Sequence, residues 1–86
     1  MIHTFQGKTP KLHQSVFAVA SAEIIGDVEI GKDASVWYNA VIRGDVNYIR
    51  IGERTNIQDG CLLHVRHLKY PLMIGSDHRT AKLPRS

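Results

Sequence analysis

Residues 22–46 read AEIIGDVEIGKDASVWYNAVIRGDV, and this stretch carries an aliphatic residue once every six positions. The series is Ile24, Ile30, Val36 and Ile42, and a small or β-branched residue stands four places after each of them. A period of six fits neither the 3.6-residue repeat of a helix nor the alternation of a simple strand. It is typical of a hexapeptide β-solenoid, in which each six-residue step forms one short strand and a turn.

The period resumes beyond Ile42 after three extra residues. Three six-residue steps make one triangular coil, so equivalent residues of neighbouring coils should stack about 4.8 Å apart, as strands do in a sheet. We expect the inserted residues to lie at a corner, with residues 46–50 looping outward. The predicted buried columns are Ile24 with Ile42 and Leu63, Ile30 with Ile51, and Val36 with Ile57.

The sequence therefore predicts an all-β protein built as a parallel β-helix of about three coils. Leu12 and Ala18 extend the columns backwards only weakly. The six-residue period is lost after Asp77, where His78 and Thr80 stand at inward positions. We expect one β-helix domain over residues 1–77 and an irregular tail over residues 78–86.

Composition narrows the classes of function. The chain has 86 residues, 43% of them hydrophobic, which suits one small globular domain. Its net charge of +3 includes a group of C-terminal cations without interleaved aromatic residues, so we expect no nucleic-acid partner. It has no run of eighteen apolar residues, so we expect no membrane span. Cys61 is the lone cysteine and cannot form an internal disulfide, which fits a cytoplasmic protein.

Several polar residues are not required by a solenoid. Arg43 and His64 each follow an aliphatic residue of the same face, one coil apart, and Gln58 has the same offset on the adjacent face. Asp45 and Asp59 each adjoin a glycine, and such pairs also form ordinary turns. A turn accounts for Asp59 equally well, but it does not call for the arginine, the amide or the imidazole. We expect these five side chains to gather at one edge, with Arg43 in salt-bridge reach of an aspartate.

These motifs also resemble those of a known family, the γ-class carbonic anhydrases, which are left-handed β-helix proteins. The resemblance is strongest to a short bacterial branch that carries hexapeptide-transferase names, and it runs from Met1 to Asp77. The residues that carry it are Lys8-Thr9-Pro10, Ser15-Val16-Phe17, Ile25-Gly26-Asp27-Val28, Ser35-Val36-Trp37, Val41-Ile42-Arg43-Gly44-Asp45 and Asn56-Ile57-Gln58-Asp59-Gly60.

The resemblance implies a homotrimer with a zinc ion, or iron or cobalt in its place, held by three histidines at each subunit interface. His64 matches the first of these histidines, and Arg43 and Asp45 match the pair that ties the subunits together beside the metal. Gln58 matches the residue that orients the metal-bound hydroxide, and Asp59 matches its acidic companion. The implied reaction is the reversible hydration of carbon dioxide to bicarbonate.

Zinc supports that chemistry because it lowers the pKa of a bound water to about 7. The product proton must then leave the site. His67 stands where some family members carry a glutamate three residues after the zinc histidine, and an imidazole could serve as a proton shuttle. An exposed loop histidine is the alternative interpretation. Val46 stands where some members carry a further acidic residue.

The sequence departs from the family pattern after Asp77. The family continues with a Gly-His and a His-Gly pair, whereas Lys82 occupies the first of these positions and the sequence reaches only Ser86. Two of the three expected zinc ligands are missing, so we expect impaired catalysis, and we interpret the chain as truncated or frameshifted after Asp77. Two alternatives stay open: a noncatalytic trimeric module, which could associate with a longer homologue, and a hexapeptide acyltransferase.

Overall fold

The structure is a computed structural model, and it describes residues 1–65 and 71–80. Within these ranges the chain forms short strands and no helix, and hence no helix that could cross a membrane. The strands are β1 (Ile2–His3), β2 (Lys11–Leu12), β3 (Phe17–Ala18), β4 (Glu23–Ile30), β5 (Ser35–Val36), β6 (Val41–Ile51), β7 (Asn56–Ile57), β8 (Leu62–His64), β9 (Leu72–Ile74) and β10 (Arg79–Thr80).

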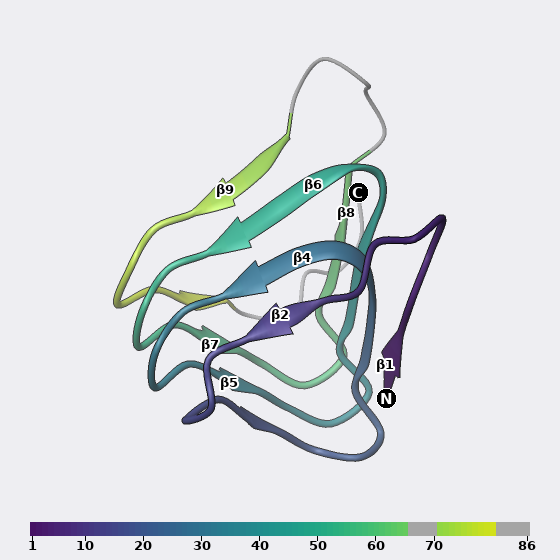
Figure 1. The fold of residues 1–86 in the computed structure, drawn as a ribbon. Coiled ribbons are helices and arrows are strands. Elements are labelled where there is room, and N and C mark those ends of the chain that lie inside the picture. Colours follow the sequence, from purple (N-terminus) through teal and green to yellow (C-terminus); the bar gives the residue numbers. More distant parts are fainter. Residues whose placement is uncertain (66–70, 81–86) are drawn as a thin grey trace.

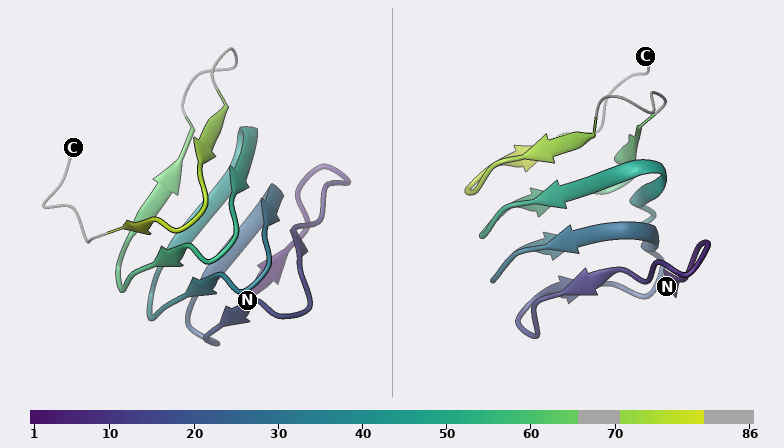
Figure 2. Two further views of the ribbon diagram at one scale, coloured as in Figure 1. Left: turned by 90° about the vertical axis from the view of Figure 1, so that its left-hand side faces the viewer. Right: turned by 45° about the horizontal axis from the view of Figure 1, so that its top comes forward.

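The strands wind into a three-sided parallel solenoid whose turns lie one above the other (Figure 1). The first face runs β1, β4, β6 and β8, and the second runs β2, β4, β6 and β9, because β4 and β6 each bend around a corner. The third face runs β3, β5, β7 and β10. All the pairings between these strands are parallel, and the right-hand view of Figure 2 shows the strands of the second face one above another. The predicted β-helix is confirmed.

The register of the strands follows the six-residue period. Ile42 pairs with Ile24 below it and with Leu63 above it, as the first predicted column requires. The other two columns are also confirmed by their pairings, Ile30 with Ile51 and Val36 with Ile57. The strand registers were therefore readable from sequence once the insertion was allowed for.

The solenoid has about four turns, one more than expected from sequence. The additional turn comes from residues 1–18, where Leu12 pairs below Ile30 and Ala18 pairs below Val36. At the other end, β10 pairs with β7 and stacks Thr80 on Ile57. Parallel pairing thus extends three residues past Asp77, into the segment where we expected a tail, and residues 81–86 lie outside the described residues.

The inside of the prism is filled by small and aliphatic side chains. Ile42 and Ile57 are fully buried, whereas Leu63 on β8 is only half-buried, in contrast to its predicted burial. A side chain in a middle turn is covered by the turns on both sides, and within the described residues Leu63 is paired on one side only. The buried hydrophobic residues are Ala22, Ile24, Val28, Ile30, Ala34, Val36, Ala40, Ile42, Ile49, Ile51, Ile57, Cys61 and Val65.

The three-residue insertion lies at the corner of β6, but its boundaries differ from those we expected. Gly26 pairs with Gly44 and Val28 pairs with Ile49, so four residues, 45–48, lie opposite the single residue Asp27. Ile49 is fully buried and pairs with Val28, whereas Val46, four places after Ile42, is exposed. The prediction that residues 46–50 loop outward is therefore wrong for residues 49 and 50. Either aliphatic satisfies the pattern, and only the pairing with Val28 decides between them.

Arg50 fastens the inserted corner to the turn below. Its guanidinium lies 3.0 Å from an Asp27 carboxylate oxygen and 3.6 Å from Glu29, and it stacks 4.4 Å from the centre of the Tyr48 ring. These contacts join the C-terminal end of the insertion to β4. The corner is thus tied to the turn below it, close to Asp45.

Candidate functional site

Arg43 and His64 form an outward-facing rung on the first face. They are register partners on β6 and β8, and Ile25 on β4 lies below Arg43 in the same column. Each follows an inward residue of the first column, and side chains of successive strand residues point to opposite faces. The predicted proximity of Arg43 and His64 therefore follows directly from the strand register.

Asp45 reaches the same place because the chain bends sharply at Gly44. A Cβ atom at Gly44 would lie 2.6 Å from the carbonyl oxygen of Asp27, closer than a side chain allows. A Cβ atom at Gly26 would in turn lie 2.6 Å from the carbonyl oxygen of Gly44. Two glycines thus let the backbones of adjacent turns approach at this corner. The bend places Asp45 beside the side chain of Arg43, two residues before it.

Asp45 is the centre of the polar cluster. Arg43 Nη2 donates a hydrogen bond to its Oδ2 at 3.0 Å, and the Val46 N–H donates to Oδ1 at 2.9 Å. Its side chain is 16% exposed. Burial alone would raise the pKa of the Asp45 carboxyl, but the hydrogen bond and positive charge of Arg43, with the Val46 N–H, lower it below its ordinary value. Asp45 is therefore held as a carboxylate.

His64 lies against that carboxylate with its Nε2 atom buried. The distance from Nε2 to Asp45 Oδ1 is 3.2 Å, but Nε2 has no well-directed hydrogen-bond partner among the described residues. A buried ring nitrogen without a partner is unfavourable unless another group binds it. This buried nitrogen therefore suits a metal ligand.

A complete metal site is not formed by the described residues. They contain no group of three histidine, cysteine, aspartate or glutamate side chains placed to hold an ion. Zinc in catalytic sites takes three protein ligands and keeps one open position. One imidazole does not meet that requirement, so the described part of the chain does not fit a zinc centre on its own.

Gln58 and Asp59 lie apart from this cluster in the structure. They border a different hollow, of 330 Å³, together with Trp37, Tyr38 and Arg79. Gln58 bonds through its backbone, accepting from the Cys61 N–H and donating to Thr80. Among the described residues neither side chain makes a hydrogen bond or an ion pair with Arg43, Asp45 or His64. Their roles at the site stay predictions, and His67 lies outside the described residues.

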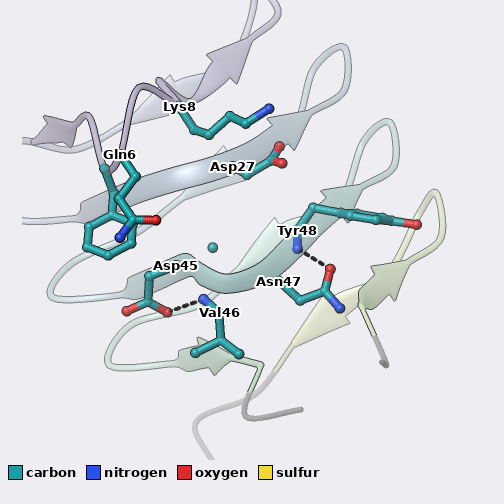
Figure 3. Close-up of a pocket in the computed structure, with 9 residues that line it drawn as sticks. Gln6, Lys8, Asp27, Asp45, Val46, Asn47 and Tyr48 are labelled. Carbon is teal, nitrogen blue, oxygen red and sulfur yellow. Dashed lines mark hydrogen bonds between the residues drawn. The ribbon is translucent and has the colours of Figure 1, made fainter. Parts of the chain in front are cut away.

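A hollow of 240 Å³ opens beside Asp45, between the inserted corner and the first turn (Figure 3). Asp45, Asn47 and Tyr48 come from the corner, and Gln6 and Lys8 come from the N-terminal loop. The sequence reading did not include the loop residues. The signal that could have found them is the insertion itself, since extra residues at a corner must lean on the turn below.

Comparisons with known proteins agree with the resemblance given above. The chain is 42% identical to Protein YrdA of Escherichia coli (strain K12) over 83 residues, which covers 90% of this chain and 45% of that protein. It is 55% identical over 58 residues to Gamma carbonic anhydrase 2, mitochondrial, of Arabidopsis thaliana, covering 67% of this chain and 21% of that protein. No protein-family model matches the sequence.

Solved structures give the same result. The crystal structure of a hexapeptide transferase family protein from Anaplasma phagocytophilum superposes with a TM-score of 0.82 at 43% identity, covering 87% of this chain and 43% of that one. The chain is thus a hexapeptide-repeat β-solenoid. More specifically, it belongs with the γ-carbonic-anhydrase-like proteins of that class. It spans less than half the length of each of these relatives.

Proposed function

We propose that this chain descends from a protein with the chemistry of the γ-carbonic anhydrases. We further propose that its 86 residues alone hydrate carbon dioxide weakly or not at all. The observation that carries the proposal is the buried, unpartnered Nε2 of His64 next to the Arg43–Asp45 pair. It supplies one imidazole of the type such a site needs, while the described residues supply no second or third. Zinc, when bound to a full set of ligands, would provide a Lewis acid that activates water.

The residues of this chain have separate roles in the proposal. Arg43 holds Asp45 ionised, and the Asp45 carboxylate lies 3.2 Å from the His64 Nε2 that would bind the ion. The missing ligands would come from a second chain, either another copy in a homotrimer or a longer homologue. Gln58 and Asp59 would join the site only in such an assembly. The protein would be cytoplasmic, with carbon dioxide and bicarbonate as its substrates.

The test measures bound zinc and carbon dioxide hydration on the purified 86-residue chain, together with its mass in solution. We expect less than one zinc per chain and hydration at the background rate. His64→Ala should abolish the residual zinc, whereas His13→Ala, which alters an exposed histidine on another face, should not. One tightly bound zinc per chain, with hydration that is lost in His64→Ala, would overturn the proposal.

A hexapeptide acyltransferase is the second candidate, and the name of the solved relative from Anaplasma phagocytophilum favours it. Acyl-coenzyme A binding separates the two candidates. We expect no binding of acetyl-coenzyme A by the chain in a calorimetric titration. Saturable binding at one site per chain would favour the transferase.

A further inference from the structure

The two ring nitrogens of His64 differ in how far they are open to an ion. Nε2 is buried and lies 3.2 Å from Asp45 Oδ1. Nδ1 is not buried in this way, and no hydrogen bond within the described residues occupies it. The side chain as a whole is 19% exposed. The folded chain therefore presents Nδ1 of His64, and not Nε2, to the solvent.

Asp45 is held in its place beside Nε2 from several sides. Arg43 Nη2 donates to its Oδ2 and the Val46 N–H donates to its Oδ1, so both carboxylate oxygens are bound. The preceding backbone is fixed as well, because an added Cβ at Gly44 would lie 2.6 Å from the Asp27 carbonyl oxygen of the turn below. Asp45 can therefore leave Nε2 only if these hydrogen bonds are exchanged for others.

This arrangement leaves no room for a zinc ion at Nε2. Zinc in proteins is held by four ligands, so an ion on Nε2 needs space for three further groups around it. A nitrogen that is buried beneath a carboxylate does not provide that space. The geometry of the single chain thus disagrees with metal binding through Nε2, in addition to the shortage of ligands among the described residues.

We propose that Asp45 is an internal lock on His64, which closes Nε2 in the single chain and leaves Nδ1 as the nitrogen that can bind an ion. Neutral imidazole binds metals through either nitrogen, so both forms of binding are chemically available. The proposal rests on the proposed function, in which Nε2 binds the ion once a second chain completes the site. That step then requires Asp45 to move away, and Arg43 is the residue that holds it. Asp45 is thus a positioning residue that acts through His64.

The experiment adds zinc at millimolar concentration to the chain with isotopically labelled histidines and follows it by nuclear magnetic resonance, which gives separate signals for the two nitrogens of each ring. The signals that disappear in His64→Ala identify that ring. In the parent chain we expect zinc to shift the Nδ1 signal of His64 much more than its Nε2 signal. Asp45→Ala removes the lock, so Nε2 should become the more strongly shifted nitrogen.

Glu53→Ala is the matched control, because it removes an exposed carboxylate at another corner, and Nδ1 should stay the binding nitrogen. Arg43→Ala is a second route to the open form, since it releases Asp45 without changing either Asp45 or His64. Far-ultraviolet circular dichroism checks that each variant keeps the solenoid.

Three results would overturn the lock: a larger shift at Nε2 in the parent chain, no zinc-induced shift at His64 in the parent chain, or binding through Nδ1 in the folded open variants. These results concern which nitrogen binds the ion. Failure of the proposed function is a different result, namely one tightly bound zinc per chain with hydration activity. The two failures can therefore be told apart.

Discussion

Two corners of the same turn each join an arginine to an aspartate, and they differ in how far the pair is removed from water. Arg43 and Asp45 are 3.0 Å apart, and the aspartate side chain is 16% exposed. Arg54 and Asp77 are closer, at 2.6 Å, and two hydrogen bonds join them across adjacent turns, but their side chains are 53% and 61% exposed. The shorter contact is the one more open to solvent.

Distance alone therefore does not rank ion pairs by their contribution to stability. Arg54 and Asp77 strongly favour each other's charged forms, so the pKa of Arg54 is raised and that of Asp77 lowered. Solvent screens that interaction, however, and exposed pairs contribute little to stability. The Arg43–Asp45 pair is joined by one hydrogen bond rather than two. Asp45 is mostly buried, however, so the loss of Arg43 would leave a partly buried carboxylate without its partner. We expect mutations to separate the two corners clearly.

The largest effect should come from Gly44→Ala at the first corner. The added Cβ would meet the backbone of Asp27, which cannot move without shifting the turn below. We expect a loss of about 3 kcal/mol in the free energy of unfolding, measured with urea. Gly75→Ala is the control, since its Cβ would make only an ordinary contact with His78 at 3.6 Å, and it should lose far less. Equal losses would show that the corner is not tightly packed.

Asp45→Asn should have the next largest effect. The amide keeps the shape of the side chain but removes the charge that Arg43 and the Val46 N–H stabilise. We expect a loss of about 2 kcal/mol in the free energy of unfolding at neutral pH. Asp59→Asn, at an exposed residue, serves as the control and should be close to neutral. A parental free energy of unfolding in Asp45→Asn would mean that this pair is ordinary surface.

Lowering the pH should also remove the stability that Asp45 contributes, with a smaller change in the free energy of unfolding than the substitutions above. The pKa of Asp45 is lower in the folded chain than its ordinary 3.8, so the folded state binds fewer protons than the unfolded state in this range. The stability from Asp45 is therefore complete above pH 3.8 and is lost as the pH falls through the lower folded pKa. Unfolding measured from about pH 6 to about pH 3 should show a shallower decline in Asp45→Asn than in the parent. Identical slopes would contradict the lowered pKa.

Arg54→Ala should have the smallest effect of the series. The pair is largely exposed to solvent, so we expect the melting temperature to stay within experimental error of the parent. Arg54 also has a left-handed backbone, with φ of 56°, which a non-glycine residue seldom adopts. Arg54→Gly tests that second feature and should be at least as stable as Arg54→Ala. A fall in melting temperature as large as that of Asp45→Asn would remove the distinction between the two corners.

The columns of the solenoid could be predicted from sequence because each inward position repeats at a fixed spacing. Ile24, Ile42 and Leu63 needed only a count and one correction for the insertion. The ends of the insertion could not be fixed in the same way, because Val46 and Ile49 are both aliphatic. The choice depends on pairing across turns, which local pattern does not record.

The sequence predicted the positions of those site residues that follow from the strand register, and it did not predict the positions of the others. Arg43 and His64 meet because they are register partners, and Asp45 meets them through the bend at Gly44. Gln58 has the same offset as Arg43 but belongs to the third face, and the structure places it beside Trp37 and Tyr38. Two residues with the same offset on different faces point the same way relative to their own faces. They nevertheless lie on different sides of the prism.

The inserted corner is a place where the length of the chain can change. Residues 45–48 lie opposite one residue of the turn below, and the columns on both sides of them keep their register. The position of each turn is therefore set by its inward residues, and the length of chain between two columns can vary without disturbing it. A foreign peptide grafted between Val46 and Asn47 would then be displayed at a defined height on a rigid scaffold. The corner is, in engineering terms, a ready attachment point.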